Sequence, residues 1–252
     1  MKGGIGLESV LDVSHLTGGY AGKGRVLHDL NFSVKRGELV GLVGLNGAGK
    51  STTIKHILGL LKSEKGTIKV NGVTLKEDVK AYRSQLTYIP EAPELYEQLT
   101  LREHLEFTEM AYDLDPNKVK ERLPKLLEQF QMEDRLDWYP GHFSKGMKQK
   151  VMILCSFLIN PSLYIVDEPF VGLDPVGIQA FLDNMVEAKK NGSGILMSTH
   201  ILSTAEQYCD RFIFLHKGQI AALGTLPEIK ASYGKDASLH DIYLSVARGE
   251  WS

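Results

Sequence analysis

Residues 44–51 have the sequence GLNGAGKS, which fits the phosphate-loop pattern G-x-x-x-x-G-K-[ST]. A short apolar segment, residues 39–43, precedes this loop, and the run STTIKHILGLL after it predicts a helix that ends near Lys62. A strand that leads into a glycine-rich loop and a helix is the context in which such a loop binds phosphate, because backbone N–H groups and the positive end of the helix dipole face the anion. The stretch therefore predicts a nucleotide-binding α/β fold.

The residues of this loop have separate expected roles. Lys50 is expected to neutralise the β- and γ-phosphate oxygens, and the Ser51 hydroxyl is expected to ligate Mg²⁺. The other residues expected to contact the nucleotide here are Asn46, Gly47, Ala48, Gly49 and Thr52.

A second polar site follows the apolar run LYIVDE, residues 163–168. Asp167 at the end of this predicted strand suits a Mg²⁺ contact through water. Glu168 is then expected to polarise an attacking water. A strand that ends in two carboxylates is often only a solvated turn, but the phosphate loop upstream favours the catalytic interpretation.

The order of predicted elements supports an α/β domain that is interrupted by helices. Strands are predicted at residues 10–14, 26–34, 39–43, 66–70 and 86–89. A charged helical stretch runs from Thr100, which forms a capping box with Glu103, to about Phe130; a second helix begins at Asp115-Pro116, and Pro124 is expected to kink or split it. Strand and helix alternation then resumes to residue 223.

Composition limits the classes of function. The 252 residues are 43% hydrophobic, enough for one large domain with a subdomain, and the net charge of −2 disfavours a nucleic-acid partner. The longest apolar run, residues 151–159, is shorter than the roughly 18 residues that cross a bilayer, so no membrane span is expected. The first residues, MKGGIGLESV, lack the apolar core of a secretory signal and predict a flexible leader in a cytoplasmic protein. Cys155 and Cys209 are expected to be reduced core residues.

The stretch HFSKGMKQK, residues 142–150, resembles a second phosphate-reading loop. Ser144 offers a hydroxyl and Gly146 an unobstructed N–H group at the start of a predicted helix. The alternative is a plain capped helix.

Taken together, the motifs resemble those of the nucleotide-binding subunits of ABC transporters. The chain has the family's motifs in the family's order over residues 10–224: Tyr20, residues 44–52, Glu91, residues 143–147, residues 163–168, residues 172–174, and His200. The resemblance implies a P-loop NTPase (RecA-like) core with an N-terminal antiparallel β subdomain and an inserted α-helical subdomain. The expected division is a leader at 1–9, the ATP-binding core at 10–90 and 161–224, the helical subdomain with the signature motif at 91–160, and a helical tail at 225–252.

The resemblance also implies how the second loop is used. In this family two nucleotide-binding domains pack head to tail, and Ser144 and Gly146 would contact the γ-phosphate held by the partner, as would Asp174, which is equally a natural helix N-cap. Tyr20 would stack on adenine, unless it is an ordinary packed tyrosine. His200 would hydrogen-bond the γ-phosphate and hold Glu168 and the water in line.

Two positions depart from the family pattern. Lys145 and Met147 replace a glycine and the glutamine of the usual LSGGQ signature, and Lys145 either strengthens the phosphate contact or points to solvent. Glu91 stands where a glutamine is expected; a carboxylate can still ligate Mg²⁺ directly or through water.

The expected function is that of a Mg²⁺-dependent ATPase that forms a homodimer around two ATP molecules and drives a separate transmembrane permease from the inner face of the cell membrane. The resemblance favours an exporter, and the permease would contact residues 91–112, unless this region is ordinary subdomain packing. Two alternatives are a soluble ABC ATPase of an assembly complex and a regulatory subunit with little turnover. The tail could support the dimer or regulate it.

Overall fold

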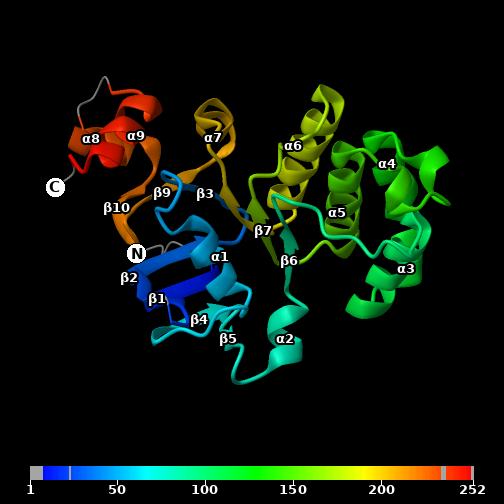
Figure 1. Cartoon of the computed structure of the whole chain (residues 1–252), viewed down its shortest axis with the longest axis horizontal. Helices are drawn as coiled ribbons and strands as arrows, with labels where there is room; N and C mark the ends of the chain where they lie inside the picture. Colours follow the sequence, from blue (N-terminus) through cyan, green and yellow to red (C-terminus); the bar gives the residue numbers. More distant parts are fainter. Residues whose placement is uncertain (1–7, 23, 234–236, 251–252) are drawn as a thin grey trace, which may run out of the picture.

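The computed structural model describes residues 8–22, 24–233 and 237–250 (Figure 1). Within these ranges the strands form a four-stranded antiparallel sheet, ordered β2-β1-β4-β5, and a six-stranded sheet, ordered β10-β9-β3-β8-β7-β6. The strands of the first sheet are β1 Ser9–Tyr20, β2 Gly24–Lys35, β4 Lys65–Val70 and β5 Val73–Thr74. The strands of the second are β3 Leu39–Val43, β6 Leu86–Ile89, β7 Leu163–Asp167, β8 Gly194–Ser198, β9 Arg211–His216 and β10 Gln219–Gly224.

The six-stranded sheet is the core of an α/β fold. Its strands are parallel from β6 through β9, and only β10 runs antiparallel. All five residues of β3, β7 and β8 are buried, which explains why these strands appear in the sequence as continuous apolar runs. Because Leu42 and Asp167 both pair with Ser198, the carboxyl ends of β3, β8 and β7 lie together at one edge of the sheet.

The helices surround this sheet or form a separate group. Their bounds are α1 Lys50–Ile57, α2 Val79–Arg83, α3 Leu101–Tyr112, α4 Pro116–Phe130, α5 Lys145–Ile159, α6 Pro175–Lys190, α7 Leu202–Tyr208, α8 Leu226–Tyr233 and α9 Leu239–Arg248, with short 3₁₀ turns at Glu133–Arg135 and Pro140–His142. Helices α3, α4 and α5 gather on the right of Figure 1, away from the antiparallel sheet, and pack on one another through Leu105, Phe130 and Leu154. The chain thus has the P-loop NTPase core, the antiparallel β subdomain and the inserted helices predicted from the sequence.

Several predicted boundaries change. The strand predicted at 10–14 extends over Ser9–Tyr20, since bulges at positions such as His15, with φ +53°, let β1 continue along β2. Ser9, predicted as part of the leader, begins this strand, whereas residues 1–7 lie outside the described residues. The helix predicted to end near Lys62 ends at Ile57, because Gly59 has a left-handed φ of +72°.

The inserted helices follow their local signals. The predicted capping box of Thr100 and Glu103 is confirmed, and Asp115 caps α4 as expected. Pro124 was predicted to kink or split this helix, and the split is wrong, because α4 is continuous over Pro116–Phe130. Pro124 is exposed, as is Lys120, whose carbonyl loses its intrahelical donor. Water can bond to a carbonyl freed on the solvent side of a helix.

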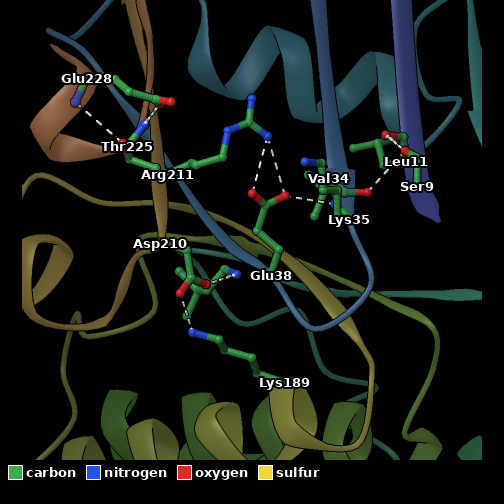
Figure 2. A network of polar contacts seen from close by, with 11 residues as sticks. Ser9, Leu11, Val34, Lys35, Glu38, Lys189, Asp210, Arg211, Thr225 and Glu228 are labelled. Atoms are coloured by element: carbon green, nitrogen blue, oxygen red, sulfur yellow. Dashed lines mark hydrogen bonds and ion pairs between the residues drawn. The ribbon is translucent and has the colours of Figure 1, made fainter. Parts of the chain in front are cut away.

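A polar network fixes the amino end of β3 (Figure 2). Glu38, only 7% exposed, accepts from Arg211 at 3.2 Å and from the Lys35 N–H at 2.8 Å. Next to it, Asp210 accepts from the Leu39 N–H at 2.8 Å and from Lys189 Nζ at 2.6 Å. The network joins β2, β3, β9 and α6 at the end of the sheet opposite the phosphate loop.

The C-terminal helices complete a third apolar cluster. Leu239, Ile242 and Val246 of α9 are buried with Val43, Ala205, Phe212 and Phe214. Helix α9 contacts β9 and α7, and α8 contacts β10. The predicted helical tail therefore packs on the core sheet beside the end of β3. No helix in the described ranges has the length and apolar character needed to cross a bilayer.

Candidate functional site

The phosphate loop lies between β3 and α1 and closes around Lys50. The lysine is 8% exposed, and its Nζ donates to the carbonyl oxygens of Gly44 at 2.8 Å and Leu45 at 3.4 Å. Gly49 has φ +114°, and a Cβ there would lie 2.8 Å from Leu27 Cδ2. The N-terminus of α1 and the Lys50 ammonium thus share one concave loop, an arrangement that fits an anion such as a nucleotide phosphate.

The turn between β9 and β10 supports this loop, a role that the sequence did not reveal. The Gly218 N–H donates to the Ala48 carbonyl at 2.9 Å, and the His28 N–H donates to the Gly218 carbonyl at 2.8 Å. Gly218 has φ +75°, and a Cβ at this position would overlap the Val26 carbonyl.

Asp167 is held by a serine of the neighbouring strand. It is 5% exposed at the carboxyl end of β7, and the fully buried hydroxyl of Ser198 donates to its Oδ1. Burial, helped by the negative charge of Asp167, raises the pKa of the nearby Tyr88. The bond from Ser198 orients the carboxylate through Oδ1, and within the described residues Oδ2 makes no hydrogen bond or ion pair.

Glu168 and His200 form a pair beside Asp167. Glu168 Oε2 lies 2.6 Å from His200 Nδ1 and accepts from the His200 backbone N–H at 3.2 Å. Because an ionised carboxylate only accepts hydrogen bonds, Nδ1 must carry the proton. Glu168 has a left-handed φ of +47°, which is costly for a residue other than glycine and is characteristic of functional positions. Its N–H is held by the Ser198 carbonyl at 3.1 Å.

Tyr20, the expected adenine-stacking residue, ends β1. Lys55 of α1 places its Nζ 3.4 Å from the tyrosine hydroxyl and 5.4 Å from the ring centroid. The contact joins the end of β1 to the helix that follows the phosphate loop. Stacking on adenine stays a prediction.

Ser144 and Gly146 begin α5. Ser144 is exposed and caps the helix, since its Oγ accepts from the Met147 N–H at 3.2 Å. A Cβ on Gly146 would overlap the carbonyl oxygen of Gly172. The capped helix is therefore present, and close packing inside the chain also requires the glycine. The phosphate contact stays a prediction. Lys145 is exposed.

Asp174 caps α6, as the sequence predicted. Its Oδ1 accepts from the Gly177 N–H at 2.6 Å, and its Oδ2 accepts from Lys150 Nζ at 2.8 Å. These bonds, the one from Lys150 first, lower the pKa of Asp174.

Glu91 follows β6 and is exposed. The preceding Pro90 carbonyl accepts from Gln149 Nε2 at 2.8 Å, and Gln149 is fully buried. The described residues contain no group of three or more His, Cys, Asp or Glu side chains that could hold a metal ion. A metal role of Ser51, Asp167 and Glu91 stays a prediction.

The predicted residues thus form two groups. The phosphate loop, Asp167, Glu168 and His200 follow adjacent strands at one edge of the sheet. Ser144, Gly146 and Asp174 lie together at the starts of α5 and α6, and within the described ranges no hydrogen bond or ion pair joins Ser144 to the phosphate loop.

Comparison with known proteins shows which family the chain resembles. The sequence model of the family described as "ABC transporter" matches residues 27–171. The chain is 58% identical over 241 residues to the ABC-type transporter ATP-binding protein EcsA of Bacillus subtilis (strain 168), covering 95% of this chain and 97% of that protein. It is 33% identical over 215 residues to the linearmycin resistance ATP-binding protein LnrL of the same bacterium, covering 85% of this chain and 69% of LnrL. A solved structure described as the "ATP binding subunit of ABC transporter" is 54% identical, with a TM-score of 0.92 over 94% of this chain and 99% of that one.

Proposed function

Because this chain belongs to the ABC transporter family as an ATP-binding subunit, we propose that it hydrolyses ATP with Mg²⁺ and so drives a separate transmembrane permease. The observation that carries the proposal is the arrangement of the phosphate loop, Asp167 and the Glu168–His200 pair after three adjacent strands. The carboxyl ends of these strands thereby bring groups that bind phosphate close to a carboxylate that can activate water.

The donor groups of the chain fit ATP and Mg²⁺. The loop around Lys50 supplies backbone N–H groups and a buried ammonium, and the exposed Ser51 and the oriented Asp167 supply hard oxygen ligands. Bound Mg²⁺ would neutralise charge on the β- and γ-phosphates. Tyr20 is the aromatic residue proposed for the adenine, and Glu91 is a proposed further contact to the metal.

Glu168 is the proposed general base. Its carboxylate is held 2.6 Å from His200 Nδ1, so the histidine fixes the rotamer from which Glu168 accepts the proton of the attacking water. Because Nδ1 donates in this bond, Nε2 is the nitrogen left to face the γ-phosphate, and it donates to a phosphate oxygen when both ring nitrogens carry protons. Lys50 would stabilise the charge that develops on the phosphoryl oxygens.

We also propose that two chains close head to tail around two ATP molecules. Ser144 and Gly146 lie at the N-terminus of α5, where a hydroxyl and a helix dipole suit an anion, and Ser144 is exposed. In one chain these residues form a group separate from the phosphate loop, as a contact in trans requires. Loss of the γ-phosphate would remove their target and release the dimer.

The permease is proposed to contact an apolar patch that consists of Tyr96, Phe107 and Met110, which are 58%, 45% and 73% exposed. The rings of Tyr96 and Phe107 meet edge to face with centroids 5.6 Å apart. The buried His104 accepts from the Tyr96 N–H at 3.0 Å and bonds the Thr100 carbonyl at 2.7 Å, so the patch is attached rigidly to α3. An exposed apolar patch next to the loop that carries Glu91 suits a partner helix.

Through this permease the chain would be located at the inner face of the cell membrane. We propose export as the direction, because LnrL is named for resistance to linearmycin and because export fits the family resemblance.

Glu168→Gln tests the proposal. The amide keeps the size of the side chain but removes the base, so ATP should bind and accumulate uncleaved. We expect phosphate release to fall to background and size exclusion with Mg-ATP to show a stable dimer. A Glu168→Gln protein that stays monomeric with bound ATP would refute the head-to-tail mechanism, and one that hydrolyses ATP at the wild-type rate would refute the role of Glu168.

A further inference from the structure

Lys150 is a buried cation that forms an ion pair with a residue of its own chain. Its side chain is 6% exposed, and its Nζ lies 2.8 Å from Asp174 Oδ2. A buried ammonium is stable only with a close partner, so the pair is maintained in the folded protein. The other oxygen of Asp174 is held by the Gly177 N–H, which leaves this carboxylate a single orientation.

A second contact joins the same two segments. The Gly146 Cα lies against the carbonyl of Gly172, which has φ +85°, and a Cβ on Gly172 would lie 3.5 Å from Lys145 Cγ. Residues 172–174 therefore contact α5 twice, one turn apart, at Gly146 and at Lys150. Helix α6 follows residues 172–174 directly. In Figure 1, α5 and α6 lie side by side, and the two helices are in contact.

The lysine side chain also passes close to a glycine of α6, Gly177. A Cβ on Gly177 would lie 3.0 Å from Lys150 Cε, so a glycine here lets the lysine stem reach the cap of α6. The neighbouring Lys148 has no part in this arrangement, because its Nζ pairs with Glu97 at 3.1 Å.

We propose that Lys150 is a positioning residue that fixes residues 172–174 to the start of α5, so that Ser144, Gly146 and Asp174 meet the partner chain as one rigid surface. The proposal rests on the head-to-tail dimer proposed above. Lys150 itself faces Asp174 of its own chain and contributes by preorganisation: residues that are already held together lose less conformational freedom when the dimer closes.

The first test uses the nucleotide-free chain and does not depend on the dimer. In Lys150→Met the cap bond from Gly177 to Asp174 remains, but the bond from Lys150 is lost. Hydrogen–deuterium exchange of residues 171–174 should be faster than in wild type, and Lys150→Arg should restore the protection. Lys148→Met, which removes a lysine two residues away on another face of α5, should leave this exchange unchanged. Equal exchange in wild type and Lys150→Met would overturn the proposal.

The second test measures the consequence in the Glu168→Gln background. We expect Lys150→Met to raise the protein concentration that gives half-maximal dimer with Mg-ATP by about tenfold, as expected for the loss of one charge-assisted hydrogen bond. Binding of a fluorescent ATP analogue to the monomer should not change, and Lys150→Arg should dimerise like its parent.

Unchanged dimerisation of Lys150→Met would refute this role of the lysine. Failure of the proposed function has a different signature, since the Glu168→Gln parent itself would then not dimerise, while the exchange result for residues 171–174 would still stand.

Discussion

Ser198 shows how much a single buried hydroxyl can determine. Its side chain donates to Asp167 and its carbonyl accepts from the Glu168 N–H, so one residue of β8 orients both acidic residues of the proposed site. Nothing in the sequence GILMST singles out this serine, because its partner is 31 residues away and is reached only through the pairing of β7 with β8.

We predict that Ser198→Ala weakens Mg²⁺ binding. Without the donor, the Asp167 carboxylate can rotate, so the Mg²⁺ concentration needed for half-maximal binding of a fluorescent ATP analogue should rise several-fold. Binding of the analogue without Mg²⁺ should stay the same, because the phosphate loop is untouched.

Ser193→Ala is the matched control for this variant. Ser193 is also buried and donates to the Pro161 carbonyl at 2.7 Å, but it precedes the other end of β8. Both variants should lose about 1 kcal/mol of stability to urea, and only Ser198→Ala should change the Mg²⁺ titration. Equal Mg²⁺ titrations of the two variants would contradict the orienting role of Ser198.

At the scale of the element, two helix caps of the same type differ in proposed function. Asp115 caps α4 and Ser144 caps α5, each through a side-chain oxygen that accepts from a backbone N–H of the first turn. Capping supplies stability, whereas only Ser144 is proposed to reach a nucleotide phosphate held by the partner.

We therefore predict that Asp115→Ala and Ser144→Ala each lower the free energy of unfolding by about 1 kcal/mol. In the Glu168→Gln background only Ser144→Ala should also impair the ATP-dependent dimer, which size exclusion with Mg-ATP would measure. If Ser144→Ala dimerises as well as Asp115→Ala, Ser144 is a helix cap and nothing more.

These elements also show what the sequence can predict. The caps at Thr100, Asp115 and Asp174 were predictable because each signal and its partner lie within three residues. Helix α1 was predicted too long, since the apolar pattern continues through Leu60 and Leu61 although Gly59 ends the helix.

Long-range contacts had no comparable signal. The bonds from Lys150 to Asp174 and from Gln149 to Pro90 span 24 and 59 residues. The predicted phosphate loop and carboxylates are contiguous motifs; the residues that hold them in place are dispersed along the chain and are identified only after folding brings them together.

At the scale of the whole molecule, what binds the apolar patch of Tyr96, Phe107 and Met110 distinguishes a transporter subunit from an ATPase of a soluble assembly. Leu95, though adjacent, packs against the core and is unsuitable for a charged substitution. We predict that a Tyr96→Glu, Met110→Glu variant folds normally, since both side chains are more than half exposed, but no longer binds the permease.

The measurement is a tagged pull-down from detergent-solubilised membranes of the native host, followed by mass spectrometry. Leu60→Glu is the control, because Leu60 is an apolar side chain 64% exposed beyond α1 and outside the patch. A polytopic membrane protein should be recovered with wild type and Leu60→Glu and lost with the double variant. Recovery of soluble partners alone would favour an assembly ATPase.

The packing of α9 on the core sheet determines where a C-terminal truncation of this chain can begin without exposing the core. A chain truncated after Gly224, where the recognisable motifs stop, would expose Phe212 and Phe214 to water and would also remove the side chains that cover Val43, the residue just before the phosphate loop. Such a fragment would keep every motif but would expose an apolar surface that favours aggregation. A functional fragment, or a fusion to another protein, therefore has to preserve the chain to about Arg248, the end of α9.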